Sequence, residues 1–100
     1  MILKLHTTKR GVIAALCDTE LIGLKYKEGE KVLDLTAAFY KGEKKDKKEI
    51  IIILKNAYII NAVGKKSIQL LEEGNFTDGS EVQMIHKIPY VQCVVLQNEL

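Results

Sequence analysis

The feature that most constrains the fold is an apolar stripe in the middle of the chain, which predicts an amphipathic helix. Its apolar residues recur every three or four positions, the spacing of one helical face: Ile50, Ile53, Leu54, Ala57 and Ile60. Asp46 and Glu49 stand at the start like a capping box, in which each side chain accepts from the other's free backbone amide. We therefore predict a helix over residues 46–60. Its many β-branched residues are mediocre helix formers, so packing must stabilise it.

Strand patterns lie on both sides of this stripe. Short apolar or alternating runs predict strands at 2–7, 12–17, 31–36, 81–87 and 91–97, and a shorter helix follows at 65–74. This order predicts an α+β fold: a small, antiparallel-leaning sheet of about five strands with two consecutive helices packed on one face. Pro89 has no amide to donate, so we place it in the connection between the last two strands. We expect a single domain, residues 1–100.

The charge of the chain is small but unevenly distributed. Fifteen basic and thirteen acidic residues leave a net charge of +2, which by itself does not imply binding to a polyanion. Residues 41–49 contain five of the basic residues, all lysines, and three of the acidic residues, so the rest of the chain has ten basic and ten acidic residues. The whole excess therefore lies in one segment beside a predicted helix start. A solvated loop is the alternative to a functional basic patch.

The cysteines and the apolar runs indicate in which cellular compartment the protein is expected. Cys17 and Cys93 lie near opposite ends of the chain and form no paired motif. No export signal is visible, and no apolar run approaches the length of a membrane span. We therefore expect a cytoplasmic protein with reduced thiols, no membrane association and no cofactor.

The segment CDTELIG, residues 17–23, contains the residue types of a reactive site. Cys17 would be the nucleophile, His6 the base, and Asp18 or Glu20 the group that orients the base. If residues 9–11 form a three-residue turn, however, His6 and Cys17 point to opposite faces of the sheet. A connection of two or four residues would return them to one face. We predict no catalytic site, with Cys17, Asp18 and His6 as the weaker candidates.

A structural interpretation explains more of the same segment. Asp18 can cap a helical turn over residues 19–22, and Gly23 can end that turn. We therefore interpret CDTELIG as the link between one strand and the next element.

Metal and phosphate chemistry have little support in the sequence. The spacings of eleven, sixty-nine and seven residues do not resemble the close ligand pairs of zinc sites, so we predict no metal site at His6, Cys17, His86 and Cys93. NAVGKKS, residues 61–67, ends like a phosphate-binding loop. It lacks the upstream glycine and is predicted to follow a helix, so we interpret Gly64 as a helix cap.

Aromatic residues beside lysines favour nucleic-acid binding as the function. Aromatic rings stack on bases and lysines neutralise phosphates in single-strand binding, and Phe39 and Tyr40 directly precede the lysine-rich segment. The predicted contact residues are Tyr40, Lys41, Lys44, Lys45, Lys47, Lys48, Lys65 and Lys66. We predict a non-enzymatic accessory or binding domain that associates with RNA or a ribonucleoprotein, with the translation machinery as one setting.

Two alternatives stay open. The broad apolar helix at 50–60 favours a protein-interaction module or a homodimer. The third hypothesis is a small enzyme, whose pocket would use His6, Cys17, Asp18, Tyr40, Asn61 and His86. Asn61 stands out because it interrupts an otherwise apolar segment.

Four stretches carry a family resemblance: CDTELIG, FYKGE (39–43), NAVG (61–64) and IPYVQ (88–92). In their order and spacing, the chain resembles the archaeal domain-of-unknown-function family number 424 over nearly its whole length. The resemblance implies an archaeal, cytosolic, single-domain α+β protein and implies no particular reaction. In the proline motif of the family we expect a histidine more often than Tyr90.

Overall fold

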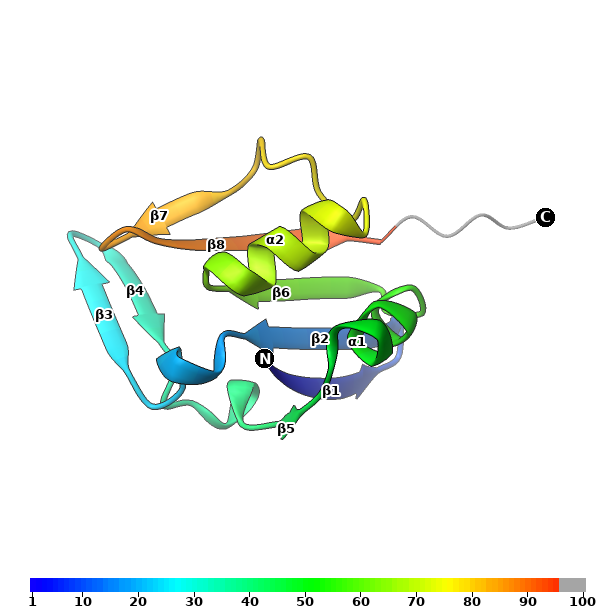
Figure 1. Ribbon diagram of the computed structural model, residues 1–100. Helices are drawn as coiled ribbons and strands as arrows, with labels where there is room; N and C mark the ends of the chain where they lie inside the picture. Colours follow the sequence, from blue (N-terminus) through cyan, green and yellow to red (C-terminus); the bar gives the residue numbers. More distant parts are fainter. Residues whose placement is uncertain (96–100) are drawn as a thin grey trace.

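A computed structural model describes residues 1–95 and contains a six-stranded main sheet (Figure 1). The strand order is β5-β1-β2-β6-β8-β7, in which β2 and β6 are parallel and every other pair is antiparallel. The strands are β1 (Ile2–Thr8), β2 (Gly11–Cys17), β5 (Glu43–Lys44), β6 (Ile59–Val63), β7 (Gln83–Ile85) and β8 (Ile88–Val94). A separate hairpin pairs β3 (Lys25–Glu28) with β4 (Lys31–Asp34).

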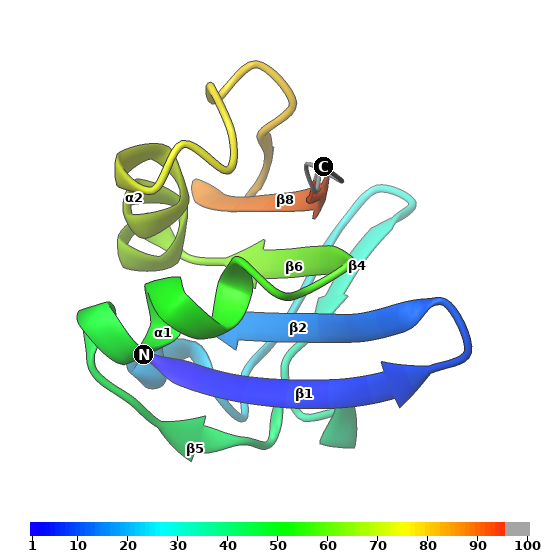
Figure 2. The ribbon, with the colours of Figure 1, turned by 90° about the vertical axis from the view of Figure 1, so that its right-hand side faces the viewer.

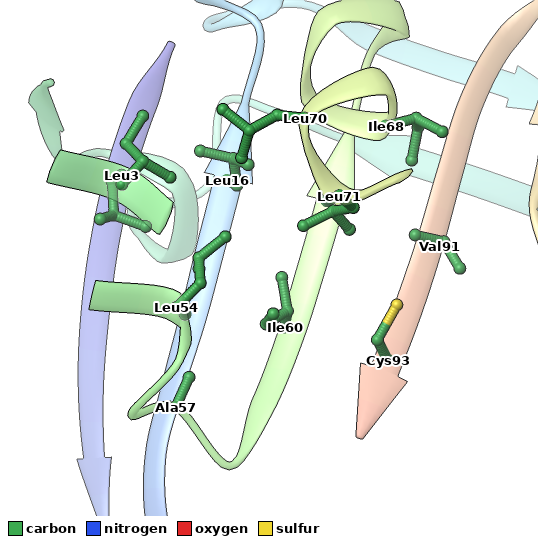
Figure 3. Close-up of a cluster of buried hydrophobic side chains, with 13 residues drawn as sticks. Leu3, Leu16, Leu54, Ala57, Ile60, Ile68, Leu70, Leu71, Val91 and Cys93 are labelled. Carbon is green, nitrogen blue, oxygen red and sulfur yellow. The ribbon is translucent and has the colours of Figure 1, made fainter. Parts of the chain in front are cut away.

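Two helices, α1 (Lys47–Leu54) and α2 (Lys65–Glu73), pack on the sheet, and two 3₁₀ turns, η1 (Thr19–Leu21) and η2 (Ala38–Tyr40), connect other elements. Figure 2 shows both helices on the side of the sheet opposite the β3–β4 hairpin. Their buried side chains join one apolar cluster with side chains of four strands, including Leu3, Leu16, Leu54, Ile60, Ile68, Leu70, Leu71, Val91 and Cys93 (Figure 3).

The α+β class is confirmed, and two details of the prediction are wrong. The main sheet has six strands instead of about five, with a two-stranded hairpin besides. The helices are not consecutive, because β6 lies between them in the chain. β6 was missed because a short apolar run is compatible with either a buried strand or a helix.

Helix α1 begins as predicted and ends earlier. The Asp46 side chain accepts a hydrogen bond from the Glu49 amide at 2.9 Å, which satisfies one free donor of the first turn. The helix ends at Leu54 instead of continuing to residue 60, and Ile59–Val63 pairs with β2 as a strand. The extra apolar face predicted for a partner is therefore much smaller; Ile52, 65% exposed, is its outward-facing member.

Pro89 lies in β8, and not in a connection as predicted. The pairing of β8 with β6 ends at Tyr90, and Pro89 contributes its carbonyl, which accepts from the Gly64 amide at 2.8 Å. A proline near the start of a strand is tolerated because few ladder bonds need its missing amide.

The second face of the sheet is partly covered, and we call it the hairpin face. A smaller apolar cluster lies there, formed by Cys17, Leu33, Leu35, Val63 and Ile85. The turn between β7 and β8 holds the hairpin in place: the His86 amide donates to the Glu28 carboxylate at 3.0 Å, and the His86 ring bonds to the Lys27 carbonyl. Among residues 1–95, neither helix is long and apolar enough to cross a membrane.

Candidate functional site

A groove lies on the hairpin face, over β6 and β8. Strand alternation directs Asn61, Tyr90 and Gln92 to this face, and the register places Asn61 directly opposite Gln92. The groove has a volume of about 340 Å³, and Tyr40, Glu81 and Gln83 complete its polar lining. It therefore brings together residues from η2, β6, β7 and β8.

Some polar side chains of the groove are hydrogen-bonded within the protein and others are not. The Tyr90 hydroxyl donates to the Gln83 side chain at 3.1 Å. Within residues 1–95, the carboxamides of Asn61 and Gln92 make no hydrogen bond. Burial, with a smaller effect from Cys17, raises the pKa of Tyr40, so its phenol is neutral near pH 7. The groove thus offers two free carboxamides beside the side chains of Tyr40 and Tyr90.

A stack of rings holds Tyr40 at the wall of the groove. The His6 ring stacks on Phe39 with centroids 4.5 Å apart and planes 5° apart, and its Nε2 bonds to the Phe39 carbonyl at 3.0 Å. Phe39 in turn meets Tyr40 edge-on at 5.1 Å. His6, a weaker catalytic candidate in the sequence, therefore fixes the position of η2.

His6 and Cys17 do not form a catalytic pair. Thr8 pairs with Gly11 across a two-residue connection, so the predicted three-residue turn is wrong and both side chains share the hairpin face. His6 nevertheless lies opposite Ile13, four residues from Cys17, which is about 13 Å along the strand.

The Cys17 thiol is also unsuited to nucleophilic chemistry. It is completely buried and donates to the Asp18 carbonyl at 3.3 Å. Burial, together with the charges of Asp18 and Glu20, raises the pKa of Cys17 to about 12. The reactive thiolate is therefore absent near neutral pH.

Asp18 caps a helix, but not the turn predicted from the sequence. No side-chain bond joins it to η1. Its buried carboxylate instead accepts from the Lys66 amide at 3.1 Å, the Ser67 amide at 2.8 Å and the Ser67 hydroxyl at 2.7 Å. These groups belong to the first turn of α2, whose N-cap residue, Gly64, has no side chain. Asp18, which directly follows β2, thus supplies the cap from a distant part of the chain.

Gly64 makes this approach possible. Its φ is +107°, and a Cβ atom there would stand 2.2 Å from the Asp18 carboxyl carbon. The first three residues of NAVGKKS are the end of strand β6, and no helix precedes them directly, so that reason for rejecting a phosphate-binding loop is wrong. The Lys66 and Ser67 amides are, however, bonded to a carboxylate and are not available to a phosphate.

The predicted contact lysines form two groups, one within residues 41–48 and one at Lys65 and Lys66, and both lie at one end of the sheet. Lys44 pairs with Ile2 at the start of β1, and Ile2 in turn pairs with Cys17 at the end of β2. Cys17 pairs with Val63 at the end of β6, two residues before Lys65. We call this end of the sheet the basic end and define it by Lys41, Lys44, Lys45, Lys47, Lys48, Lys65, Lys66 and Lys87.

Some of these lysines are already neutralised. Lys45 lies 3.5 Å from both Glu43 and Glu49, and Lys66 lies 3.9 Å from Glu20. The other lysines of the basic end are exposed and form no ion pair within residues 1–95. Lys87, which the sequence did not indicate, lines a cleft of about 230 Å³ with Lys65 and Lys66.

The structure separates the other predicted site residues. Tyr40 lines the groove on the hairpin face, whereas both helices lie on the other side of the sheet (Figure 2). Cys17 and Cys93 belong to different apolar clusters, and His86 lies in the β7–β8 turn. In the part of the chain that is described, no three His, Cys, Asp or Glu side chains are grouped to hold a metal ion.

Comparison with known proteins places the chain in a family. The model of a family described as protein of unknown function (DUF424) matches residues 5–96. The chain belongs to this family. The resemblance carried by the four sequence stretches is thereby confirmed.

One solved structure resembles this DUF424 chain closely in fold. It is the crystal structure of an uncharacterized conserved protein from Methanopyrus kandleri, with 24% sequence identity and a TM-score of 0.82. The match covers 99% of this chain and 94% of that one. No curated protein matches the chain. The comparisons therefore establish the family and the fold.

The groove was largely missed in the sequence. Asn61 stands out in the sequence as a polar interruption of an apolar segment, but no local pattern groups Tyr90 and Gln92 with it. A usable signal was present, because residues 90 and 92 alternate with buried Val91 and Cys93 as a one-sided polar strand does.

Proposed function

We propose that this DUF424 chain is a non-enzymatic RNA-binding accessory domain that contacts the RNA backbone through its basic end. One observation carries the proposal: lysine groups from distant parts of the sequence lie at the same end of one sheet. Exposed lysines attract phosphates chiefly by releasing condensed counterions, which needs charge density more than a shaped pocket. Such a surface suits an accessory domain of a ribonucleoprotein.

The spacing of the two lysine groups supports a single-stranded ligand. β5 and β6 are separated by β1 and β2, three strand steps, so the groups lie about 14 Å apart. An extended strand can contact both. The net positive charge of the chain lies within residues 41–49, because the residues outside this segment are balanced in charge, and this favours one oriented contact over diffuse attraction.

The test compares two triple charge reversals. The first variant is Lys47→Glu/Lys48→Glu/Lys65→Glu, at the basic end. The matched control is Lys9→Glu/Arg10→Glu/Lys55→Glu, in the β1–β2 turn and just after α1. Each changes the net charge by the same amount. Acidic residues suit helix N-termini, so the first variant should fold.

Binding is measured by fluorescence anisotropy with a labelled oligouridylate over a range of salt concentrations. We expect the basic-end variant to bind at least about tenfold more weakly and to lose about two units of salt slope, because each contact to a single strand contributes about 0.7. The control should stay close to wild type. Light scattering on the same samples gives the oligomeric state. Equal losses in the two variants, or no wild-type binding at low salt, would refute the proposal.

A further inference from the structure

We infer that the groove on the hairpin face binds a single nucleobase, and that it prefers bases with an exocyclic amino group over uracil. This inference rests on the proposed function, since a strand lying on the basic end would supply the base. Lys41, exposed and directly after Tyr40, joins the basic end to the groove.

The floor of the groove carries paired carboxamides. Asn61 and Gln92 are cross-strand neighbours, so their Cβ atoms lie about 5 Å apart on one face. Each carboxamide has two donor hydrogens and one acceptor oxygen, and neither is used within residues 1–95. Adjacent amide donors and acceptors match the edge of a base, which amide side chains read in pairs of hydrogen bonds.

The walls of the groove supply aromatic surface. Tyr40 and Tyr90 are both half-buried and line the groove, and each has a fixed partner: Phe39 for Tyr40 and Gln83 for Tyr90. Stacking of bases on aromatic rings is the usual second component of single-strand recognition. Because these rings are held in place before binding, little ordering is needed when a base enters.

The charge of the groove selects the part of the nucleotide that enters. Glu81 is its charged lining residue, and no lysine or arginine lines it. A phosphate would therefore be disfavoured, while a carboxylate accepts readily from an exocyclic amino group. Uracil has no such group. The volume of about 340 Å³ lies near the lower limit of ligand pockets and fits one base.

The test compares short oligoadenylate, oligocytidylate and oligouridylate of equal length, each labelled and measured by anisotropy. We expect wild type to prefer oligoadenylate or oligocytidylate over oligouridylate by about fivefold or more, the discrimination of one paired contact. The variant Asn61→Ala/Gln92→Ala should bind all three like oligouridylate. The control Gln69→Ala, on the exposed side of α2, should keep the preference. Thermal unfolding confirms that each variant is folded.

A second measurement separates this inference from the proposed function. Amide NMR spectra are followed during titration with cytidine, adenosine and uridine, which have no phosphate. We expect shifts at Asn61, Tyr90 and Gln92 with cytidine or adenosine and smaller ones with uridine. Salt-dependent oligomer binding without base preference would overturn the groove assignment and leave the basic end standing. Nucleoside shifts without oligomer binding would support the groove and refute RNA binding; the absence of both would overturn both.

Discussion

Removing the Asp18 carboxylate should destabilise the protein more than removing any ordinary helix cap. Asp18 is 3% exposed and Ser67 is completely buried. Asp18→Ala leaves the Ser67 amide and hydroxyl without their acceptor, and a buried polar group without a partner costs about 1–3 kcal/mol. The Lys66 amide is only partly buried, so water can replace its bond. We expect a loss of about 3 kcal/mol in the free energy of unfolding.

Asp18→Asn isolates the contribution of the charge. The oxygen of the amide can still accept from Ser67, but its NH₂ group would face the Lys66 amide, donor against donor. The negative charge at the start of α2 is lost as well. We expect a smaller loss, about 1–2 kcal/mol.

The assay is equilibrium urea unfolding followed by circular dichroism. Asp46→Ala is the matched control, because Asp46 caps α1 through one exposed bond to the Glu49 amide. That loss should be about 1 kcal/mol, typical of an exposed cap. If Asp18→Ala costs no more than Asp46→Ala, the reasoning from burial is wrong.

Two further predictions concern the same region. Gly64→Ala should lower the free energy of unfolding by more than about 2 kcal/mol, because it combines a positive φ with a clash against Asp18. The loss should be smaller when Asp18→Ala is also present. If the two losses measured by urea unfolding are additive, the contact between Gly64 and Asp18 is contradicted. The second concerns alkaline pH. Because burial raises the pKa of Cys17 to about 12 from its ordinary 9.0, the stability that the protonated thiol provides is complete below pH 9 and is lost as the pH rises toward 12. The loss in the free energy of unfolding should be up to about 1.4 kcal/mol per pH unit. Under reducing conditions, Cys17→Ala should flatten the plot of stability against pH between pH 9 and 11. Identical plots for wild type and variant would show that the thiol is not protected.

Local patterns predicted much of the fold. The first hairpin, the cap of α1 by Asp46, the whole of α2 and the α+β class follow from alternation, helical spacing and capping residues. These features depend on neighbours within a few positions, so the local sequence contains their causes. The Ile59–Val63 strand was missed for the opposite reason: its pairing partners, β2 and β8, are distant in the chain.

The candidate sites divide in the same way. The lysines and Tyr40 were recognised from composition, and Asn61 from its apolar surroundings. Whether Asn61 meets Gln92 depends on register, and so does the shared face of His6 and Cys17. A one-residue change in register reverses every side chain of a strand.

By itself, the sequence determined the family, the fold class, the excess of positive charge at residues 41–49 and the residue types available for binding. The tertiary structure alone decided that Asp18 caps α2, that the lysine groups lie at one end of the sheet, and that two carboxamides face a groove lined by two tyrosines. The physical reason is the difference in sequence separation over which the interactions act. Propensity and capping act over a few residues, whereas strand pairing brings together groups that are far apart in the chain, and no local pattern specifies which groups these are.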